Sequence, residues 1–479
     1  MRFLAGSVIL AGLLASRTAA AQQPPAAPTT IAVGDWQLAP TMEVRVRGEY
    51  RHDAPDLGGL DMYGRATPRT RDAWVVLERT RVGLGAERGA LRAQVTLQDA
   101  RAFGSPSPNA TLAGARGLGQ LAPYEGFLEM RTSGVRPTYL RLGRQAVVWG
   151  EGRLVGNADF SPVGRSLDAA RAHVAAGNFD FEALAAILEI PQPLGAAFGD
   201  RSGSNTSGVQ LYGVTVKWTV DPLFRVEAFG LARVARSSGA ELDGSRFAIQ
   251  RAVGERYTGA LRVSGDDKGW SYGAEGAYQM GNADTLRFNG ADIAAWAAAA
   301  HVQKTLEQIV LTPTFRLNGS YASGDDGSGK YTQFDPLLAD PQRFHGMMDL
   351  FAWSNMFDLG GRATVVPWTD TALSFEYRYA QLAKSRGEWI GSYLTAVGSA
   401  TRPPVVAITP APAGANVDPS LGHELDVGFS WRPWMPLELR ASWSGLLLGD
   451  GAKAIMASHQ RGSHNLAQYA FLQATLNVP

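Results

Sequence analysis

Arginine is the residue type in this sequence whose chemistry best suits a ligand. The chain has 39 arginines but only six lysines. The planar guanidinium group can hold a carboxylate through two hydrogen bonds, and it stays charged at every relevant pH. Many of these arginines alternate with apolar residues, as in Leu-Arg-Ala at 91–93 and Leu-Arg-Leu at 140–142. A biased genome composition would also raise the arginine content, so their positions matter more than their number.

Period-two alternation recurs along the chain and predicts β-strands. In 91–98 (LRAQVTLQ) apolar side chains fall on one face and polar side chains on the other, and the pattern returns at 373–379 and 437–444. We expect about 18 strands, each close to the length that crosses a bilayer at a tilt. The expected ranges are 41–51, 73–86, 90–101, 123–132, 137–147, 167–176, 178–189, 208–220, 223–235, 256–265, 269–280, 292–303, 310–322, 359–368, 371–382, 422–432, 436–446 and 466–478.

The connections between these strands alternate in length. The short ones include 133–136, 221–222, 266–268, 369–370 and 433–435, and the long ones include 52–72, 102–122, 148–166, 190–207, 236–255, 323–358 and 383–421. Short periplasmic turns and long extracellular loops are typical of outer-membrane barrels. The predicted fold class is therefore all-β, a transmembrane antiparallel β-barrel of about 18 strands. An alanine-rich run at 291–301 is the expected strand that could instead be helical.

The start of the chain resembles a secretory signal peptide. Arg2 precedes an apolar run at 3–15, and three alanines at 19–21 offer a small-residue cleavage site. We expect a signal peptide over 1–21, a periplasmic lead-in over 22–40 and the barrel over 41–479. Without the two arginines of the signal peptide, basic and acidic residues are nearly balanced. This balance argues against a nucleic-acid partner, and the absence of cysteine is compatible with a barrel.

Several blocks of the sequence resemble the alginate export family of outer-membrane proteins. A strand ending in LRLGRQ at 140–145 is followed by WGEGRLVG at 149–156, DFS at 159–161 and GRSLD at 164–168. Further blocks that resemble the family are LQDAR at 97–101, YASGD at 321–325 with Phe334, His345, Gly346 and Asp349, and GHELD at 422–426. The resemblance covers most of 40–475 and implies an 18-stranded barrel whose lumen passes an anionic polysaccharide. The chain ends in Leu-Asn-Val-Pro at 476–479, whereas such barrels usually end on an aromatic residue.

Arginines that lie opposite apolar neighbours are expected to face the lumen, because a charge on the lipid face costs roughly 2–4 kcal/mol at the midplane. Those that we expect along the substrate pathway are Arg45, Arg47, Arg79, Arg81, Arg92, Arg141, Arg144, Arg153, Arg165, Arg171, Arg262, Arg316, Arg362, Arg378 and Arg440. A series of such sites would lower the barrier for a polyanion, provided that no single site binds too tightly. Acidic residues on the same faces could instead pair with the arginines and stiffen the wall. They are Glu43, Glu49, Glu182, Glu227, Glu376, Asp426 and Glu438.

The sequence therefore predicts a bacterial outer-membrane channel for an alginate-like polyuronate or related anionic solutes. The alternatives are a porin for small organic anions, which loops folded into the lumen would favour, and an outer-membrane enzyme or a surface adhesin. We expect no enzyme, cofactor or metal site, because GxSxG and HExxH motifs are absent and the acidic turn at 324–329 lacks EF-hand spacing. The expected partners are outer-membrane lipid, anionic polysaccharide or small anions, and periplasmic export or assembly proteins.

Overall fold

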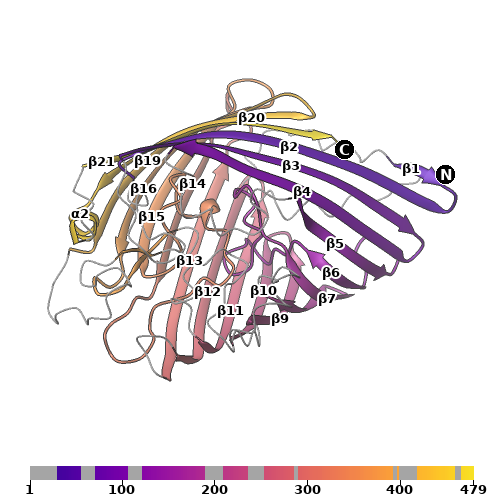
Figure 1. The fold of residues 1–479 in the computed structure, drawn as a ribbon, viewed down its shortest axis with the longest axis horizontal. Helices are drawn as coiled ribbons and strands as arrows, with labels where there is room; N and C mark the ends of the chain where they lie inside the picture. The colour runs from indigo at the N-terminus through magenta and orange to yellow at the C-terminus, as the bar shows by residue number, and fades with distance from the viewer. Residues whose placement is uncertain are drawn as a thin grey trace, which may run out of the picture.

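The predicted barrel is present and closed. The computed structural model describes residues 30–54, 71–105, 121–188, 209–235, 253–284, 290–391, 396–398, 418–458 and 465–478. In these residues, 18 antiparallel strands form one ring (Figure 1), which closes where Met42 of the first strand pairs with Val478 of the last. The expected signal peptide, residues 1–21, lies outside the described residues.

The ring contains each of the 18 strands that the alternation predicts. They are β2 (Trp36–His52), β3 (Asp72–Arg88), β4 (Leu91–Ser105), β5 (Leu121–Arg131), β6 (Tyr139–Gln145), β7 (Leu167–Ala176), β8 (Phe179–Ile187), β9 (Val209–Asp221), β10 (Phe224–Ala235), β11 (Val253–Asp267), β12 (Trp270–Asp284), β13 (Ala291–Thr305), β14 (Thr314–Ala322), β15 (Met356–Val365), β16 (Thr371–Leu382), β19 (Ser420–Trp434), β20 (Leu437–Leu448) and β21 (Leu466–Val478). Four small elements lie outside the ring order: β1 (Ile31–Val33), the pair β17 (Trp389–Ile390) and β18 (Ala396–Gly398), and the 3-10 turn Pro341–Arg343. A single helix, α2 (Asp450–Ser458), completes the described elements.

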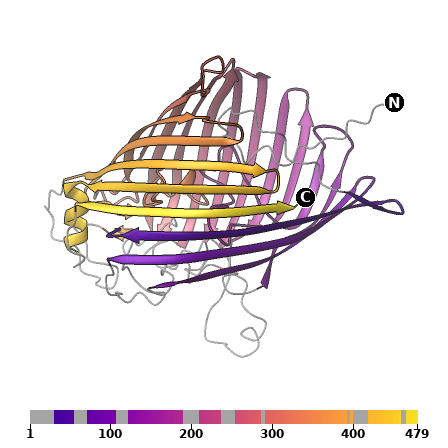
Figure 2. The ribbon, with the colours of Figure 1, turned by 90° about the horizontal axis from the view of Figure 1, so that it is seen from above.

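The two ends of the barrel differ as the connection lengths predict. Figure 2 shows α2 at one end of the strands and the C-terminus at the other. The short turns, such as 89–90 and 222–223, lie at the end of the C-terminus, and the long connections lie at the opposite end. The short-turn end is therefore periplasmic and the long-loop end extracellular.

One strand boundary differs from the expectation, and the alanine-rich run takes the form of the expected strand. Strand β2 begins at Trp36 rather than at position 41, because its residues 37–41 pair with residues 83–87 of β3 and its residues 36–38 also pair with β1. The alanine-rich run is a strand, β13, whose inward alanines at 295, 297 and 299 are buried while Trp296 faces outward. Small inward side chains leave room for other chain segments inside the barrel.

The faces of the strands follow the pattern of a membrane barrel. Outward-facing apolar side chains are strongly exposed, for example Leu128 at 69%, Leu472 at 67% and Leu317 at 63%. The aromatic residue nearest the C-terminus, Phe471, instead faces inward and is 5% exposed. Within the described residues, no helix is long and apolar enough to cross a bilayer.

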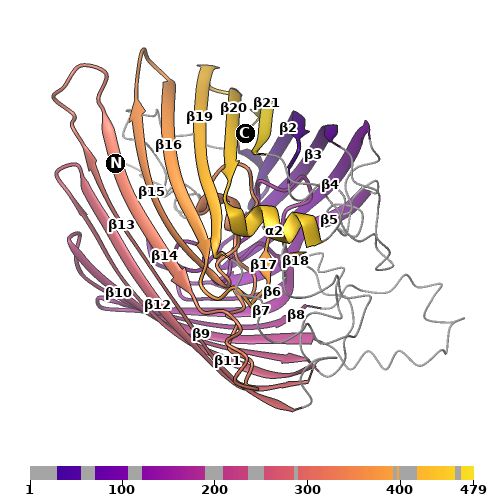
Figure 3. The same ribbon diagram turned by 90° about the vertical axis from the view of Figure 1, so that its left-hand side faces the viewer.

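Two long connections enter the barrel. We call residues 146–166, between β6 and β7, lumen loop 1, and residues 323–355, between β14 and β15, lumen loop 2. Figure 3, viewed from the end at which α2 lies, shows chain segments between the walls of the ring. Lumen loop 2 contributes Leu350 and Phe351 to an apolar cluster at this end, which also includes Trp389 and Ile455 of α2. Part of the barrel interior is thus filled by the chain itself.

Candidate functional site in the barrel lumen

The two lumen loops contact each other inside the barrel. Val155 and Leu338 form a parallel β-bridge. The Gly156 N–H donates to the carbonyl of Leu338 over 2.8 Å, and the Leu338 N–H donates to the carbonyl of Leu154 over 2.9 Å. A third backbone hydrogen bond of 2.8 Å joins Asp340 to Gly152. A hydrogen-bonded contact between two loops therefore lies inside the lumen.

Arg165 fastens this contact. Its Nη1 donates to the carbonyls of Gly156 in lumen loop 1 and of Leu338 and Ala339 in lumen loop 2, over 2.8, 2.5 and 3.0 Å. The side chain is only 9% exposed. Backbone carbonyls at such a junction need donors, and a buried guanidinium group supplies several at once. The structure thus places Arg165 within the loop junction.

Four wall arginines hold the middle of lumen loop 1. Arg45, Arg47, Arg79 and Arg81, on β2 and β3, all point inward to residues 159–161, and we call them the arginine clamp. Arg45 donates to the carbonyls of Asp159 and Ser161 over 2.7 and 2.8 Å. Arg47 donates to the carbonyl of Phe160 over 2.8 Å and lies 3.8 Å above its ring.

The carboxylate of Asp159 is the ionic part of this clamp. Its Oδ1 accepts from Arg79 over 2.9 Å and from Arg81 over 3.0 Å. Burial alone would raise the pKa of Asp159, but the clamp arginines outweigh burial and hold it well below its usual range. Sequence analysis quoted Asp159 as part of a motif but gave it no role, because a loop residue has no strand period to place it.

A second cluster anchors the beginning of lumen loop 1. Arg262 on β11 donates to Glu227 over 2.6 Å and to Glu151 of the loop over 3.0 Å. Arg153 lies 4.0 Å above the ring of Phe344 in lumen loop 2. Burial would raise the pKa of Glu151, but the neighbouring cations lower it to about 2.

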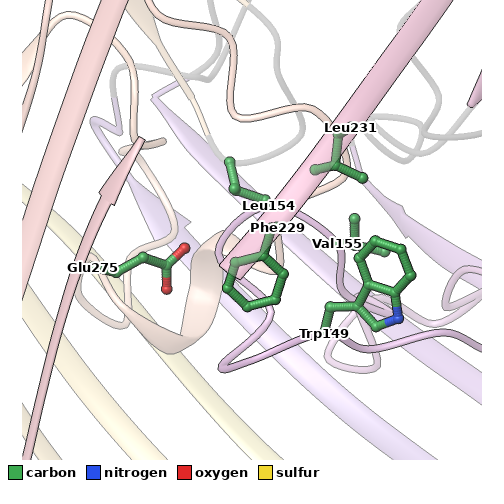
Figure 4. A pocket seen from close by; sticks show the side chains of 6 residues that line it. All are labelled: Trp149, Leu154, Val155, Phe229, Leu231 and Glu275. Atoms are coloured by element: carbon green, nitrogen blue, oxygen red, sulfur yellow. The ribbon is translucent and has the colours of Figure 1, made fainter. Parts of the chain in front are cut away.

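Apolar side chains pack beside this cluster. Figure 4 shows Glu275 at the edge of a small pocket against the wall, and the other residues that line it are Trp149, Leu154, Val155, Phe229 and Leu231. Lumen loop 1 packs so closely against this part of the wall that position 213 on β9 accepts only glycine. A Cβ atom there would lie 2.5 Å from the Trp149 ring. The loop is therefore packed against the wall as well as tied to it by charges.

Wall carboxylates hold lumen loop 2. Glu424 and Asp426 on β19 accept from the N–H groups of Met348 and Met347 over 2.9 and 3.3 Å. Gly346 has a φ of 93°, and a Cβ there would lie 2.5 Å from the Glu424 carboxylate. Sequence analysis placed Asp426 in the lumen but missed Glu424, although both share the inward face of one strand.

Most other predicted pathway arginines form ion pairs on the inner wall. Arg141 pairs with Glu129, Arg171 with Glu182 and Arg92 with Glu87, at 2.5, 2.7 and 3.4 Å. On the other side of the ring, Arg362 pairs with Glu376, and the buried Arg378 pairs with both Glu376 and Asp358.

Arg144 differs from the other arginines that we expected in the lumen. It lies three residues after the inward-facing Arg141, and therefore on the opposite face of β6. Its register partner is Asp168, with which it forms a 2.9 Å ion pair. The expectation that Arg144 lines the lumen is corrected by this alternation.

Two inward arginines stand out from the paired ones. Arg316 on β14 and Arg440 on β20 form no hydrogen bond or ion pair with any residue in the described ranges. Arg316 is the register partner of Arg362, and Arg362 is close enough to act electrostatically on both. Glu151 and Glu438 act electrostatically on Arg316 and Arg440 as well, so these two arginines differ from the others by their unused hydrogen-bond donors and not by an excess of positive charge on the wall.

Comparison with solved structures identifies the architecture. OpdK of Pseudomonas aeruginosa, solved with vanillate, has a TM-score of 0.52 and 12% identity, covering 92% of this chain and 98% of that chain. OccK2 (OpdF) of the same organism, solved in complex with glucuronate, gives the same TM-score, identity and coverage. At this identity the likeness concerns the fold, which is that of outer-membrane porins.

Comparison of sequences identifies the family. No curated protein matches the chain. The family model described as alginate export matches residues 37–453, which is most of the chain. The protein is therefore a bacterial outer-membrane β-barrel of the channel-forming type, and it belongs to the alginate export family.

Proposed function

We propose that this protein is a passive outer-membrane channel for small organic anions, with uronates and similar carboxylates as the substrate class. The contact between the two lumen loops carries the proposal. A polymer would need a continuous wide lumen, whereas a small solute can pass beside a loop that narrows it. Among the expectations from sequence, the small-anion porin therefore fits the geometry better than a polysaccharide conduit.

The expected charge of the substrate follows from the part of the inner wall that the lumen loops leave uncovered. Arg316 and Arg440 form no hydrogen bond or ion pair with a described residue, although Glu151 and Glu438 act on them electrostatically, so their guanidinium donors are available to a passing carboxylate. The clamp arginines, in contrast, are occupied by lumen loop 1. A pathway with a few free cations attracts an anion without holding it too tightly. The glucuronate and vanillate bound to barrels of similar fold are solutes of this kind.

Passage of a polyuronate chain is the second candidate, and the family match supports it. The two candidates differ in what should block an open channel. A monomeric uronate would reach the free arginines and reduce the current in a concentration-dependent way. A polyuronate would do so only if its chain can thread past the junction of the lumen loops.

The test is single-channel conductance of the refolded protein in a planar bilayer. We expect anion selectivity and block by glucuronate, with little block by a long polyuronate at equal uronate concentration. In R316Q/R440Q the glucuronate block should weaken at least about tenfold, because losing a charged hydrogen bond costs roughly 1.5–3 kcal/mol.

The matched control is R88Q, because Arg88 is exposed at the periplasmic end of β3. A cation-selective pore, or a block that R88Q weakens as much as R316Q/R440Q, would refute the proposal. Efficient block by polyuronate would favour the polymer instead.

A further inference from the structure

A row of polar side chains crosses four neighbouring strands of the inner wall. Ser271 on β12 is the register partner of Gln303 on β13, which also pairs in register with Arg316 on β14. On the other side of Arg316 lies Arg362 on β15. Figure 1 shows these four strands side by side. We call Ser271, Gln303, Arg316 and Arg362 the polar row.

The polar row faces the lumen and is open to it. Val302 and Leu317, the sequence neighbours of Gln303 and Arg316, are 41% and 63% exposed on the lipid face of their strands. Successive residues of a strand point to opposite faces, so the row lies on the inner face. All four members of the row are partly exposed, whereas three of the four clamp arginines are buried. A solute in the lumen can therefore reach the row.

Most hydrogen-bonding atoms of the polar row are unused. The side chains of Ser271, Gln303 and Arg316 form no hydrogen bond with a residue in the described ranges. Arg362 pairs with Glu376 through Nε and Nη2, and its Nη1 has no partner in the part of the chain that the structure describes. The row thus presents a hydroxyl, an amide and guanidinium donors to whatever lies in the lumen.

The polar row lies between the periplasmic mouth and the anchor of lumen loop 1. One row nearer to the periplasm, Thr305 and Thr314 share a hydrogen bond of 3.0 Å beside the turn at 306–313. One row nearer to the outside, His301 lies 3.7 Å from Glu151 of lumen loop 1. A solute that enters from the periplasm therefore reaches the row before it meets the loop junction.

The order of the side chains suits a hydroxylated carboxylate. Arg316 and Arg362 are neighbours, so one carboxylate can accept hydrogen bonds from both guanidinium groups. On the other side of Arg316, the amide of Gln303 and the hydroxyl of Ser271 can each donate to one hydroxyl group and accept from another. Side chains directly opposite each other on neighbouring strands lie about 5 Å apart. Ring hydroxyls of a sugar acid lie at such distances from its carboxylate.

We propose that Gln303 and Ser271 determine specificity, by selecting carboxylates that carry ring hydroxyls when the carboxylate binds at Arg316. The inference rests on the proposed function of the channel and names the residues that distinguish one small anion from another. A carboxylate with an apolar ring would also reach Arg316. However, its ring would displace water from Gln303 and Ser271 without replacing the hydrogen bonds. The preference therefore arises from neutral hydrogen bonds and not from charge, which both solutes share.

Block of single-channel current by two solutes of equal charge tests this inference. Glucuronate and cyclohexanecarboxylate each carry one carboxylate on a six-membered ring, but only glucuronate has ring hydroxyls. We expect glucuronate to block the wild type more tightly. Gln303→Leu should weaken the glucuronate block about fivefold, because one net hydrogen bond is lost, and should leave the cyclohexanecarboxylate block unchanged. Ser271→Ala should act in the same direction, and the double variant should lose the preference.

The matched control is Gln94→Leu on β4, on the opposite side of the ring. Gln94 is also partly exposed, but its amide already donates to Thr96 Oγ1 over 3.2 Å. Q94L should leave the block by both solutes unchanged. The heat-dependent shift in gel mobility shows that each variant has folded into a barrel.

The outcomes separate this inference from the proposed function. Equal block of the wild type by the two solutes would overturn the inference, and so would a Q303L that weakens neither block or weakens both equally. In each of these cases R316Q/R440Q would still weaken both blocks, and the anion channel would stand. If R316Q/R440Q left both blocks unchanged, the proposed function would fail and the inference with it.

Discussion

At the scale of single residues, the lumenal arginines have two different roles. The clamp arginines are buried and bonded to lumen loop 1, whereas Arg316 and Arg440 have no such partner among the described residues. A buried guanidinium group costs free energy unless it is paired. Removing one partner of such a pair therefore destabilises the fold more than replacing both partners by apolar residues. The two kinds of arginine should therefore respond differently to substitution.

Arg79→Ala tests the structural kind. The side chain of Arg79 is fully buried and pairs with Glu43 and Asp159. Its loss should destabilise the fold by about 3 kcal/mol, because Glu43 loses its partner and Asp159 loses one of the arginines that neutralise it. Thermal unfolding followed by gel mobility measures this change. R316A serves as the comparison and should unfold within a few degrees of the wild type, and equal losses in both variants would contradict the division of roles.

Asp340 gives the lumen a dependence on pH. This lumen loop 2 residue is 4% exposed, and burial raises its pKa from 3.8 to about 6 despite the nearby Arg343. A raised pKa means that the folded protein holds the proton more tightly than the unfolded chain. The stability from this group is complete below pH 4 and is lost as the pH rises through about 6.

The loop junction should accordingly be tighter at pH 5 than at pH 7. The pKa difference corresponds to on the order of 3 kcal/mol at most. We expect lower conductance and a higher unfolding temperature at pH 5, and D340N should remove most of both differences. A wild-type channel with the same conductance and unfolding temperature at the two pH values would contradict this assignment.

Strand alternation predicted which way most residues point but not what they contact. It placed Arg45, Arg79 and Arg362 on inward faces, and it would have placed Arg144 outward had it been applied there too. Asp159 and Glu151 could not be assigned in this way, because they lie in a loop without a period. Whether an inward arginine is free depends on such loop residues, so the sequence could not separate the free arginines from the clamp.

At the scale of elements, the two lumen loops behave as one inserted unit. The family-like blocks at 149–156, 321–325 and 345–349 lie largely in these loops. Their contact depends on close backbone approach at Gly156, where a Cβ would lie 2.8 Å from the Cβ of Asp340 and 3.0 Å from the carbonyl of Gly152. Strand patterns predict the wall well, but long-range loop contacts of this kind leave no periodic signal.

Gly156→Val should therefore separate the loops without breaking the barrel. The added side chain has no space at the junction, and overpacking of this kind typically costs 1–3 kcal/mol. Open-channel conductance should rise, while gel mobility still reports a folded barrel. Gly276→Ala is the matched control, because nothing lies within 4 Å of a Cβ added there. Unchanged conductance in G156V would show that the junction does not limit the current.

At the scale of the whole molecule, the ring of strands closes through pairing between neighbouring strands. Each strand is paired on both sides around the ring, from β2 to β21, and these ladders satisfy the backbone in lipid. The lumen loops add apolar packing and ion pairs inside. Within the described residues, lumen loop 1 forms no backbone–backbone hydrogen bond with a strand of the ring, whereas Ser323 and Tyr331 of lumen loop 2 continue the ladder of β13. Closure and constriction are therefore separate properties of this molecule.

Replacing residues 148–164 by a short Gly-Ser linker tests this separation. The barrel should still assemble and keep its heat-dependent gel shift, because the ladders of β6 and β7 are untouched. Conductance should rise several-fold, and a polyuronate that hardly blocks the wild type should now enter and block, because the obstacle to a polymer has been removed. The same linker at 133–137, in a periplasmic turn, should change neither property. If the wider channel still excluded the polymer, the constriction would lie elsewhere in the barrel. If the barrel failed to assemble, the inserted loop would belong to the core on which the wall is built.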